Sequence, residues 1–277
     1  MNKTIAFIGT GAMGGAMIRA ACRSIDPAQI VLTDYIQEKA EHLAAELGCR
    51  TAPSNLAAAA AADYVFLCVK PQGSAGIIRE IAPVLRASLA DGRPKLLCSI
   101  LAGVTAETIR GIVGNAAYPV VRIAANTPAL VGKGLMIYAC DASVDHEDIG
   151  DLEVVLSGCG AVTRLDEGLM DQAMAVAACS PAFVYMFIEA LADGGVLTGL
   201  DRTRAQQFAA QAVCGAAAMV LETGLHPGVL KDMVTSPGGS TIAGVAALEA
   251  AGFRQAVISA VSASYGRNVQ LGEVGGD

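Results

Sequence analysis

Short, uninterrupted apolar runs alternate with longer stretches of helical character over the first 165 residues of the chain. Runs of this kind are typical of strands that are buried on both faces of a parallel sheet. They occur at Ile5–Ile8, Ile30–Thr33, Tyr64–Val69, Leu96–Ile100, Val120–Ala124 and Leu135–Cys140. The predicted helices between and after them are Ala12–Cys22, Gln37–Leu47, Ala57–Ala62, Ser74–Arg86, a segment capped by Thr105, and Asp148–Leu156. This alternation predicts an α/β fold with a doubly wound sheet.

The pattern changes near Asp166, where strand-like runs disappear and helical periods take over. The predicted helices are Glu167–Leu197, Arg202–Thr223, Pro227–Val234, Thr241–Ala250 and Arg254–Leu271. We therefore expect two domains, an N-terminal α/β domain of residues 1–165 and an all-helical domain of residues 166–277. A helical domain that follows such a sheet often supplies the other wall of a ligand cleft.

A glycine motif follows the first predicted strand. Gly9, Gly11 and Gly14 have the spacing G-x-G-x-x-G and lead directly into a predicted helix. In this context the first glycine permits a tight turn, the second lets the backbone approach a pyrophosphate, and the third lets the helix pack closely on the strand. The cofactor contacts expected here are Ile8, Gly9, Gly11, Ala12, Met13 and Gly14. We therefore predict a Rossmann domain that binds a dinucleotide; the alternative is a glycine-rich turn without a ligand.

Asp34 ends the second predicted strand, about 20 residues after the motif, where an acid that binds ribose hydroxyls is expected. A carboxylate at this point would repel the 2′-phosphate of NADPH. No arginine follows directly to offset the repulsion, since the next residues are Tyr35, Ile36 and Gln37. We predict that NADH is used at least as well as NADPH.

Further polar residues and glycines occur where other strands end. Lys70, Gly103 and Asn126 follow predicted strands, and Ser99 lies near the carboxyl end of one. Ligands bind at the carboxyl ends of strands in this architecture. For Lys70 and Asn126 taken alone, a solvated strand end is an equally good interpretation.

Composition narrows the function classes. Hydrophobic residues make up 53% of the chain and charged residues only 16%, so we expect part of the apolar surface to lie in an oligomer interface. The net charge is −7 and no basic stripe is visible, which argues against a nucleic-acid partner.

The eight cysteines form no C-x-x-C pair, and the three histidines are isolated. We therefore expect reduced thiols in a cytoplasmic protein and no metal site. The N-terminus begins directly with a strand, so no signal peptide is expected. The longest apolar run, Ala173–Ile188, is shorter than the roughly 20 residues of a membrane helix, which predicts a buried helix and no membrane partner.

A second chemical stretch, T-S-P-G-G-S-T-I at Thr235–Ile242, precedes a predicted helix. Its two glycines and its hydroxyl residues would expose several N–H groups at a positive helix end. A small carboxylate can bind such a loop without an arginine. An ordinary helix–helix turn with an N-cap is the alternative.

At this point the chain resembles the bacterial pyrroline-5-carboxylate reductases over nearly its whole length. The matching motifs are I-G-T-G-A-M-G at Ile8–Gly14, V-K-P at Val69–Pro71, S-I-L-A-G at Ser99–Gly103, N-T-P-A at Asn126–Ala129, F-I-E-A-L-A-D-G at Phe187–Gly194 and H-P-G-V-L-K-D-M-V-T-S-P-G-G-S-T-I at His226–Ile242. The resemblance implies reduction of L-1-pyrroline-5-carboxylate to L-proline with NADH or NADPH, the last step of proline biosynthesis. It also implies a homodimer formed through the helical domain, and dimers of the family sometimes assemble further into rings.

The resemblance also implies roles for individual residues. Further cofactor contacts would be Asn55, Val69, Lys70, Pro71, Ser99, Ala102 and Gly103, and substrate contacts would be Ser236, Gly238, Gly239, Ser240, Thr241 and Glu167. Thr241 is the candidate catalytic residue, because its hydroxyl would hydrogen-bond the ring nitrogen. A threonine is too weak an acid to act alone. We therefore expect Thr241 to orient the ring nitrogen rather than to act as the acid catalyst. The alternative for Glu167 is an acid that stabilises a helix N-terminus.

Two departures from the family pattern concern the substrate pocket. Ala177-Ala178-Cys179-Ser180 stands where the family usually has S-G-S-x, and Phe183 replaces a usual tyrosine. Ala124-Ala125 replaces a usual Met-Pro. These changes bear on the shape of the pocket and so on the preferred imine, whereas the cofactor motifs are intact.

Two other functions remain open from the sequence. A related dehydrogenase of β-hydroxy acids would share the Rossmann half, but it would carry a lysine on the first long helix of the second domain, and Glu167–Leu197 contains none. A non-catalytic dinucleotide-binding regulatory protein is suggested by Ala177-Ala178, although the intact Ser236–Thr241 stretch argues against it.

Overall fold

The computed structural model describes residues 2–274 and divides into two compact units. The sheet unit comprises the residues up to Cys179 together with those from Ser264 onward, and the helical unit is Ser180–Ala263. The sheet unit is therefore built from two separate stretches of chain. Helix α12 (Phe253–Val274) begins in the helical unit and ends in the sheet unit, where the buried Asn268 amide donates to the carbonyl of Asp171 at 3.5 Å.

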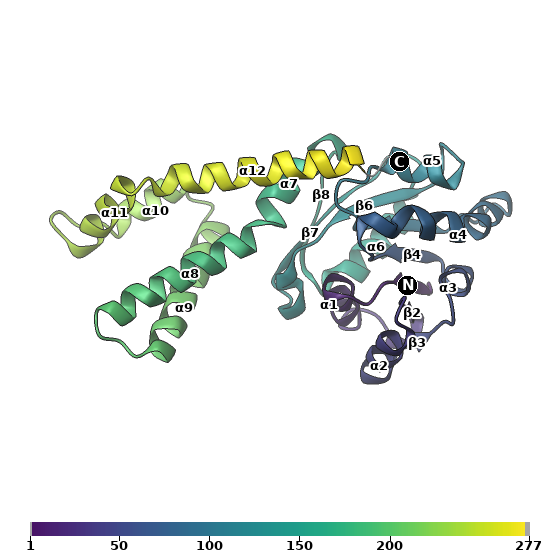
Figure 1. Cartoon of the computed structure of the whole chain (residues 1–277), viewed down its shortest axis with the longest axis horizontal. Helices are drawn as coiled ribbons and strands as arrows, with labels where there is room; N and C mark the ends of the chain where they lie inside the picture. Colours follow the sequence, from purple (N-terminus) through teal and green to yellow (C-terminus); the bar gives the residue numbers. More distant parts are fainter. Residues whose placement is uncertain (1, 275–277) are drawn as a thin grey trace. The chain divides into compact units, whose positions relative to one another are not determined.

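One eight-stranded sheet forms the centre of the sheet unit (Figure 1). The strands are β1 (Ile5–Ile8), β2 (Ile30–Thr33), β3 (Arg50–Thr51), β4 (Tyr64–Leu67), β5 (Leu96–Ser99), β6 (Val120–Ala124), β7 (Gly134–Ala139) and β8 (Gly160–Arg164). Their order is β3-β2-β1-β4-β5-β6-β7-β8, and all neighbours are parallel except β6 and β7. Because β1 lies between β2 and β4, the strand order reverses there, which is where a doubly wound sheet binds its ligand.

Helices cover both faces of this sheet, and alternate residues of β1 pack on opposite sides. Ile5 and Phe7 join the core beneath α1 (Ala12–Ala21), α2 (Gln37–Leu47) and α6 (His146–Ser157). Ala6 and Ile8 join the second core, beneath α3 (Asn55–Ala61), α4 (Pro71–Ala90) and α5 (Ala106–Val113). The predicted Rossmann fold is confirmed.

Two strands and part of one helix escaped prediction. Strand β3 has two exposed residues, and β8 is an edge strand with a largely exposed pattern, so neither has the apolar run of a buried strand. Helix α4 begins at Pro71, three residues before the predicted start at Ser74. Proline is well tolerated in the first turn, since its missing N–H would have no helical partner there.

The predicted single helix Glu167–Leu197 is broken near Cys179. It consists of the short 3₁₀ helix η3 (Glu167–Leu169), α7 (Met170–Ala177) and α8 (Ser180–Leu197). Two further 3₁₀ helices, η1 (Pro27–Gln29) and η2 (Thr127–Val131), lie in the loops of the sheet unit.

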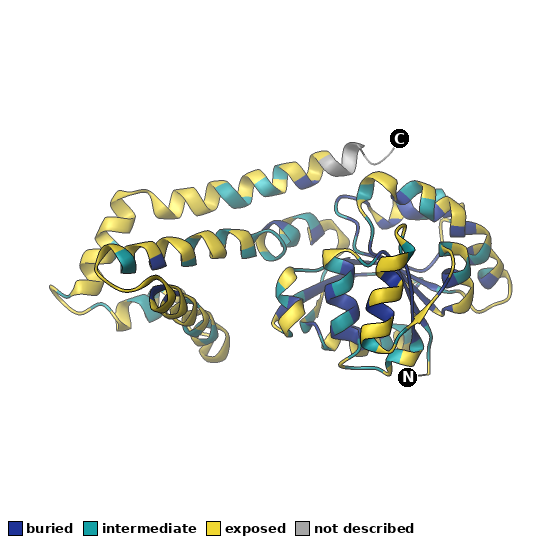
Figure 2. Cartoon of the chain, turned by 60° about the horizontal axis from the view of Figure 1, so that its bottom comes forward, coloured by how far each residue is buried: buried dark blue, intermediate teal, exposed yellow. Residues whose placement is uncertain are grey.

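The helical unit contains α8, α9 (Arg202–Thr223), α10 (Pro227–Met233), α11 (Ser240–Ala250) and the first part of α12. Within residues 180–263, which the structure describes throughout, the buried residues are Ala192, Ala205 and Ala209. Figure 2 shows these helices exposed along most of their length. Large apolar side chains such as Met186, Phe208 and Leu221 are among the exposed residues.

The helical stretch Glu167–Leu197 is long and apolar enough to cross a membrane, with a mean hydropathy of 1.7 in a window that is 6% buried. The expectation that the run Ala173–Ile188 is too short to cross a membrane is therefore wrong for the longer helical stretch that contains it. The expectation that it is a buried helix is also wrong, because Ala175 is the one buried residue of the run. Two bent helix pairs, Arg202–Thr223 with Pro227–Met233 and Ser240–Ala250 with Phe253–Gln270, also qualify if each pair is counted as one span.

Candidate active site

The three glycines of the motif occupy distinct environments at the carboxyl end of β1. Gly9 has a φ of +103°, and a Cβ there would lie 2.5 Å from the carbonyl oxygen of Cys68. A Cβ on Gly14 would lie 2.3 Å from the carbonyl oxygen of Gly9. A Cβ on Gly11 would meet nothing within 4 Å. The first and third glycines are thus required by the fold, whereas the second faces open space in which a ligand can approach the backbone.

The N-terminus of α1 is prepared for an anion. Gly11 is the N-cap and offers no side chain to the first turn, so the N–H groups of Ala12, Met13 and Gly14 have no capping partner in the helix. Unpaired N–H groups and the positive end of the helix dipole favour a phosphate at this point. The open space at Gly11 and the uncapped turn together fit the pyrophosphate of a dinucleotide.

Asp34 is tied to the glycine turn. One carboxylate oxygen accepts the Thr10 N–H at 2.7 Å and the Thr10 hydroxyl at 2.9 Å, and the other accepts the Ile36 N–H at 2.9 Å. Burial opposes the charged form, but these hydrogen bonds outweigh it and lower the pKa of Asp34. A carboxylate has about four acceptor positions, so one remains for a ribose hydroxyl. That role stays a prediction.

A cavity of about 760 Å³ lies along the carboxyl ends of β1, β2 and β4. Seven residues predicted to bind the cofactor line it, namely Ile8, Gly9, Gly11, Asp34, Asn55, Val69 and Lys70. The other predicted cofactor residues, Ala12, Met13, Gly14, Pro71, Ser99, Ala102 and Gly103, do not line it, although Ala12 lines an adjoining cavity of about 710 Å³. The volume is of the size that small-molecule sites usually have.

Sequence reasoning missed three residues around this cavity. The Thr10 hydroxyl holds Asp34, the exposed Lys39 lines both cavities near that carboxylate, and Glu80 accepts the Asn55 amide at 2.9 Å. Thr10 could have been found as the hydroxyl between the first two glycines. Lys39 and Glu80 give no local signal, because their places depend on how α2 and α4 pack.

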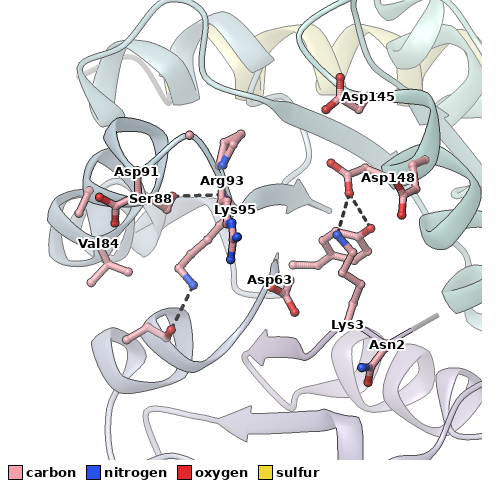
Figure 3. Close-up of a pocket in the computed structure, with 16 residues that line it drawn as sticks. Asn2, Lys3, Asp63, Val84, Ser88, Asp91, Arg93, Lys95, Asp145 and Asp148 are labelled. Atoms are coloured by element: carbon pink, nitrogen blue, oxygen red, sulfur yellow. Dashed lines mark hydrogen bonds and ion pairs between the residues drawn. The ribbon is translucent and has the colours of Figure 1, made fainter.

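A larger cavity of about 1030 Å³ lies at the amino ends of β1, β4 and β5 (Figure 3). Two of its charged groups, Lys95 and Lys3, already have partners. Lys95 Nζ donates to the Ala60 carbonyl at 3.1 Å and also to the Ala62 carbonyl, and Lys3 pairs with Asp148 at 3.5 Å. Burial lowers the pKa of Lys95. No residue predicted to bind a ligand lines this cavity.

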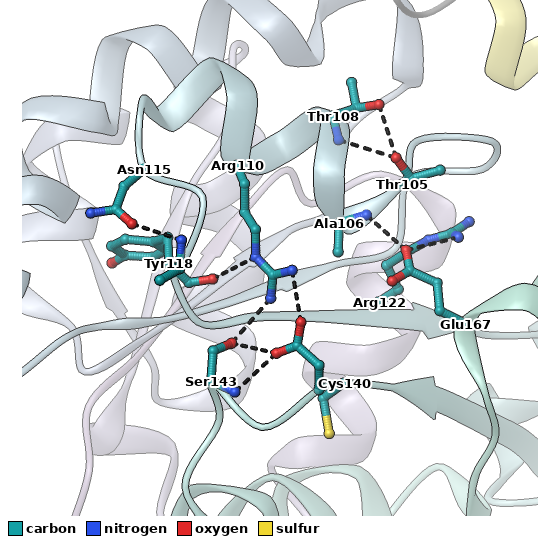
Figure 4. A network of polar contacts seen from close by, with 12 residues as sticks. Thr105, Ala106, Thr108, Arg110, Asn115, Tyr118, Arg122, Cys140, Ser143 and Glu167 are labelled. Atoms are coloured by element: carbon teal, nitrogen blue, oxygen red, sulfur yellow. Dashed lines mark hydrogen bonds and ion pairs between the residues drawn. The ribbon is translucent and has the colours of Figure 1, made fainter.

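Glu167 belongs to the sheet unit and joins two elements there (Figure 4). Its Oε1 accepts the N–H of Ala106, the first residue of α5, at 2.8 Å, and pairs with Arg122 Nη1 at 3.3 Å. The alternative prediction for Glu167 was that it stabilises the N-terminus of the helix in which it lies. The helix N-terminus that it contacts is instead that of α5. Its second oxygen accepts no hydrogen bond within the described part of the chain, which leaves it able to meet a ligand.

Arg122, on β6, is buried, with 4% of its side chain exposed. Its Nη2 lies 3.7 Å from Asp171 Oδ1, and neither of these buried atoms makes a hydrogen bond. The Arg122 guanidinium therefore lies between two carboxylates and is held mainly by their charge. Glu167 precedes α7, and Asp171 lies in its first turn. Thr105 caps α5 as predicted, by accepting the Thr108 N–H at 3.1 Å.

The Ser236–Thr241 loop belongs to the helical unit and forms an uncapped helix end. Gly238 has a φ of +67°, and a Cβ on Gly239 would lie 2.5 Å from Ser236 Oγ. Helix α11 begins at Ser240, with Gly239 as an N-cap that offers no side chain. Thr241 is the second helical residue, and its exposed hydroxyl makes no hydrogen bond to any described residue. The loop is thus an open array of N–H groups, and Thr241 is free to contact a ligand.

A Rossmann sheet with an open glycine turn and a separate helical unit defines a dinucleotide-dependent oxidoreductase. The helical half, residues 167–271, matches the family model for pyrroline-5-carboxylate reductase dimerisation, and residues 4–103 match that for coenzyme F420-dependent NADP oxidoreductases. The pyrroline-5-carboxylate reductase of Synechocystis is 39% identical over 99% of this chain and 100% of the relative. The Escherichia coli enzyme is 40% identical over 98% of this chain and 99% of the relative. The chain belongs to the pyrroline-5-carboxylate reductase family.

Solved structures agree. The reductase of Coxiella burnetii superposes with a TM-score of 0.87 at 29% identity, covering 98% of this chain and 99% of that one. The pyrroline carboxylate reductase of Plasmodium falciparum, determined with NADP bound, gives a TM-score of 0.85 at 29% identity over 98% of each chain.

Proposed function

We propose that this chain reduces L-1-pyrroline-5-carboxylate to L-proline with NADH or NADPH. The observation that carries the proposal is the match of nearly the whole chain, at about 40% identity, to reductases named for this substrate. A β-hydroxy-acid dehydrogenase is disfavoured because Glu167–Leu197 lacks a lysine. A non-catalytic dinucleotide-binding protein is disfavoured by the intact Ser236–Thr241 loop, in which the Thr241 hydroxyl makes no hydrogen bond to any described residue.

In this proposal the sheet unit holds the cofactor through its backbone. The first turn of α1 binds the pyrophosphate, Asp34 and Asn55 face the ribose side of the cavity, and the loops after β4 and β5 contact the nicotinamide half. When bound, the cofactor supplies the hydride that reduces the C=N carbon. Positioning is the main task of the protein, because hydride transfer needs little further chemistry from side chains.

The first turn of α11 holds the substrate carboxylate with the N–H groups of Ser240 and Thr241, supported by Ser236 and the two glycines between them. As hydride adds to the carbon, the ring nitrogen gains a lone pair and becomes basic, and the Thr241 hydroxyl donates a hydrogen bond to it. Glu167, fixed by Ala106 and Arg122, is the acid that we propose for the cationic imine. In the proposed arrangement, Thr241 orients the nitrogen, and a water that it binds provides the proton.

We propose that a second copy of the chain, and no membrane, covers the exposed apolar helices of the helical unit. The family model that matches residues 167–271 describes dimerisation. A homodimer in the cytoplasm, which can assemble further into a ring of dimers and has no nucleic-acid partner, completes the proposal. The domain division expected near residue 166 coincides with the start of the family match at residue 167, whereas the compact units divide between Cys179 and Ser180. Light scattering of the detergent-free protein tests it, because a stable monomer at micromolar concentration would contradict it.

The reaction is tested by following NADH and NADPH absorbance with pyrroline-5-carboxylate and by identifying proline through chromatography. We expect oxidation of the cofactor to match the proline formed, one for one. If the folded protein binds the cofactor but forms no proline, the proposed reaction is wrong and the non-catalytic regulatory function is favoured. Reduction of NAD⁺ or NADP⁺ in the presence of a β-hydroxy acid, without any proline formed from pyrroline-5-carboxylate, would select the dehydrogenase.

A further inference from the structure

Two cysteines from neighbouring helices lie side by side in the sheet unit. Cys22 is the C-cap of α1, and Cys49 follows Gly48, the C-cap of α2. Their Sγ atoms are 3.6 Å apart, and both residues are half-buried free thiols. Across the described residues, no other two cysteine sulfurs are in hydrogen-bond contact.

The backbone on both sides of the pair is fixed by helix ends. The Cys22 N–H donates to the Ile18 carbonyl at 3.0 Å, and the Cys49 N–H donates to the Ala44 carbonyl at 3.0 Å. Gly48, with a φ of +79°, turns the chain so that Cys49 faces α1. The sulfurs of a disulfide lie about 2.05 Å apart, so a side-chain rotation of modest size would bring the pair into bonding distance.

The charges around the pair distinguish the two thiols. The hydrogen bond between the two sulfurs has the largest effect on Cys22; burial opposes it, and the nearby Arg19 and Arg23 add to it, so that the pKa of Cys22 falls below its ordinary value. Bonding to Cys22 and burial raise the pKa of Cys49. A thiolate is the reactive form of cysteine. Cys22 is therefore the better nucleophile and Cys49 the resolving thiol.

We propose that Cys22 and Cys49 form an oxidative modification site, at which a hydroperoxide converts the two thiols into a disulfide that joins α1 to the end of α2. The Cys22 thiolate attacks one peroxide oxygen, the O–O bond breaks, and hydroxide or alkoxide leaves, which gives a sulfenic acid on Cys22. Cys49 then loses its proton, its sulfur attacks Cys22 Sγ, and hydroxide leaves. In total, two thiols and one hydroperoxide give one disulfide, one water and one alcohol (a second water when the oxidant is hydrogen peroxide).

The bond would close a loop that contains β2 and Asp34. Closing a loop of this length restricts the unfolded chain, so we expect the oxidised sheet unit to melt about 5–10 °C higher, and a dithiol reductant to reverse the change. This inference does not depend on the proposed reaction, because its readouts are a covalent bond and a melting temperature.

Peptide mass spectrometry of the full chain tests the proposal. After hydrogen peroxide treatment, alkylation and trypsin digestion, Cys22 lies in residues 20–23 and Cys49 in residues 40–50, and neither peptide holds another cysteine. We expect a cross-linked pair of these peptides, at least roughly tenfold more abundant than any other cysteine pair. The exposed Cys214 serves as the control for general oxidation. Oxidation of Cys214 without the Cys22–Cys49 cross-link would overturn the proposal.

Serine variants separate the two roles and are conservative enough to fold. Cys49→Ser should trap sulfenic acid on Cys22, which a dimedone-type reagent labels, and should abolish the rise in melting temperature. Cys22→Ser should leave Cys49 unlabelled. Labelling of Cys49 in that variant would show that Cys22 is not the attacking thiol.

Discussion

In the sheet unit, successive residues of β1 are buried on opposite faces beneath two layers of helices, whereas the helical unit buries only three alanines among its residues 180–263. Both units are rich in apolar residues, so composition does not separate them. They differ in whether the apolar side chains have partners within one copy of the chain. The sheet unit can account for its own stability by burial, while the helical unit needs a second surface.

The largest expected effect is on assembly. Phe208→Glu replaces an exposed apolar side chain of α9 with a carboxylate. We expect the dissociation constant of the dimer to rise about 100-fold or more, because an unpaired charge in a buried interface is costly. Analytical ultracentrifugation measures this. The matched control is Val154→Glu, an exposed apolar residue of α6 in the sheet unit, which should leave the oligomer unchanged. If both variants behave alike, the two units do not differ in the way described.

The glycines of the sheet unit separate folding from ligand binding. Gly11→Val adds a side chain where nothing lies within 4 Å, so the melting temperature should stay unchanged. The valine should displace the cofactor, and we expect kcat/KM to fall about 100-fold. Gly14→Ala is the contrast, since its Cβ would lie 2.3 Å from the Gly9 oxygen and should lower the melting temperature. Full activity of the Gly11→Val variant would show that the pyrophosphate does not bind at this turn.

The corresponding test in the helical unit is Thr241→Ala. Because Gly239, and not Thr241, is the N-cap of α11, the variant should melt like the wild type. Its kcat should fall roughly tenfold, by more than KM rises, if the hydroxyl contacts the nitrogen at which charge changes. Thr241→Ser keeps the hydroxyl and should restore most of the rate. An unchanged kcat in the alanine variant would exclude Thr241 from the reaction.

The smallest expected effect concerns the choice of cofactor. We expect kcat/KM with NADH to equal or exceed that with NADPH, because the hydrogen bonds from Thr10 and Ile36 keep Asp34 charged. Asp34→Asn should raise the ratio of kcat/KM with NADPH to kcat/KM with NADH by a few-fold. Lys39→Ala should shift it downward, since Lys39 is the cation near this carboxylate. A wild-type enzyme that strongly prefers NADPH would contradict the prediction.

The sequence predicted the parts of the fold that depend on local pattern. The strands Ile5–Ile8 and Ile30–Thr33 agree with the structure because four buried residues in a row are a distinctive signal. Strand β8 was missed because its exposed pattern resembles a loop, and its pairing with β7 is a tertiary contact. The break after α7 was missed because the apolar composition continues across it.

The candidate site shows the same limit. The glycine turn and the α11 loop are contiguous motifs, so their residues could be named in advance. The contact of Glu167 with the first turn of α5 joins residues 61 positions apart, and the buried position of Arg122 beside it follows from β6 packing. Such contacts depend on the folded arrangement of several elements, for which the sequence offers no spacing to recognise.

The discontinuous sheet unit has a consequence for protein synthesis. The ribosome delivers all eight strands first, then the whole helical unit, and only afterwards the residues from Ser264 onward that complete the sheet unit. The Asn268 contact with Asp171 therefore forms only after the whole helical unit has been synthesised, including the surface proposed to bind a second copy. A chain that stops just before Ser264 would therefore contain every strand and the whole helical unit and would still lack the part of α12 that completes the sheet unit.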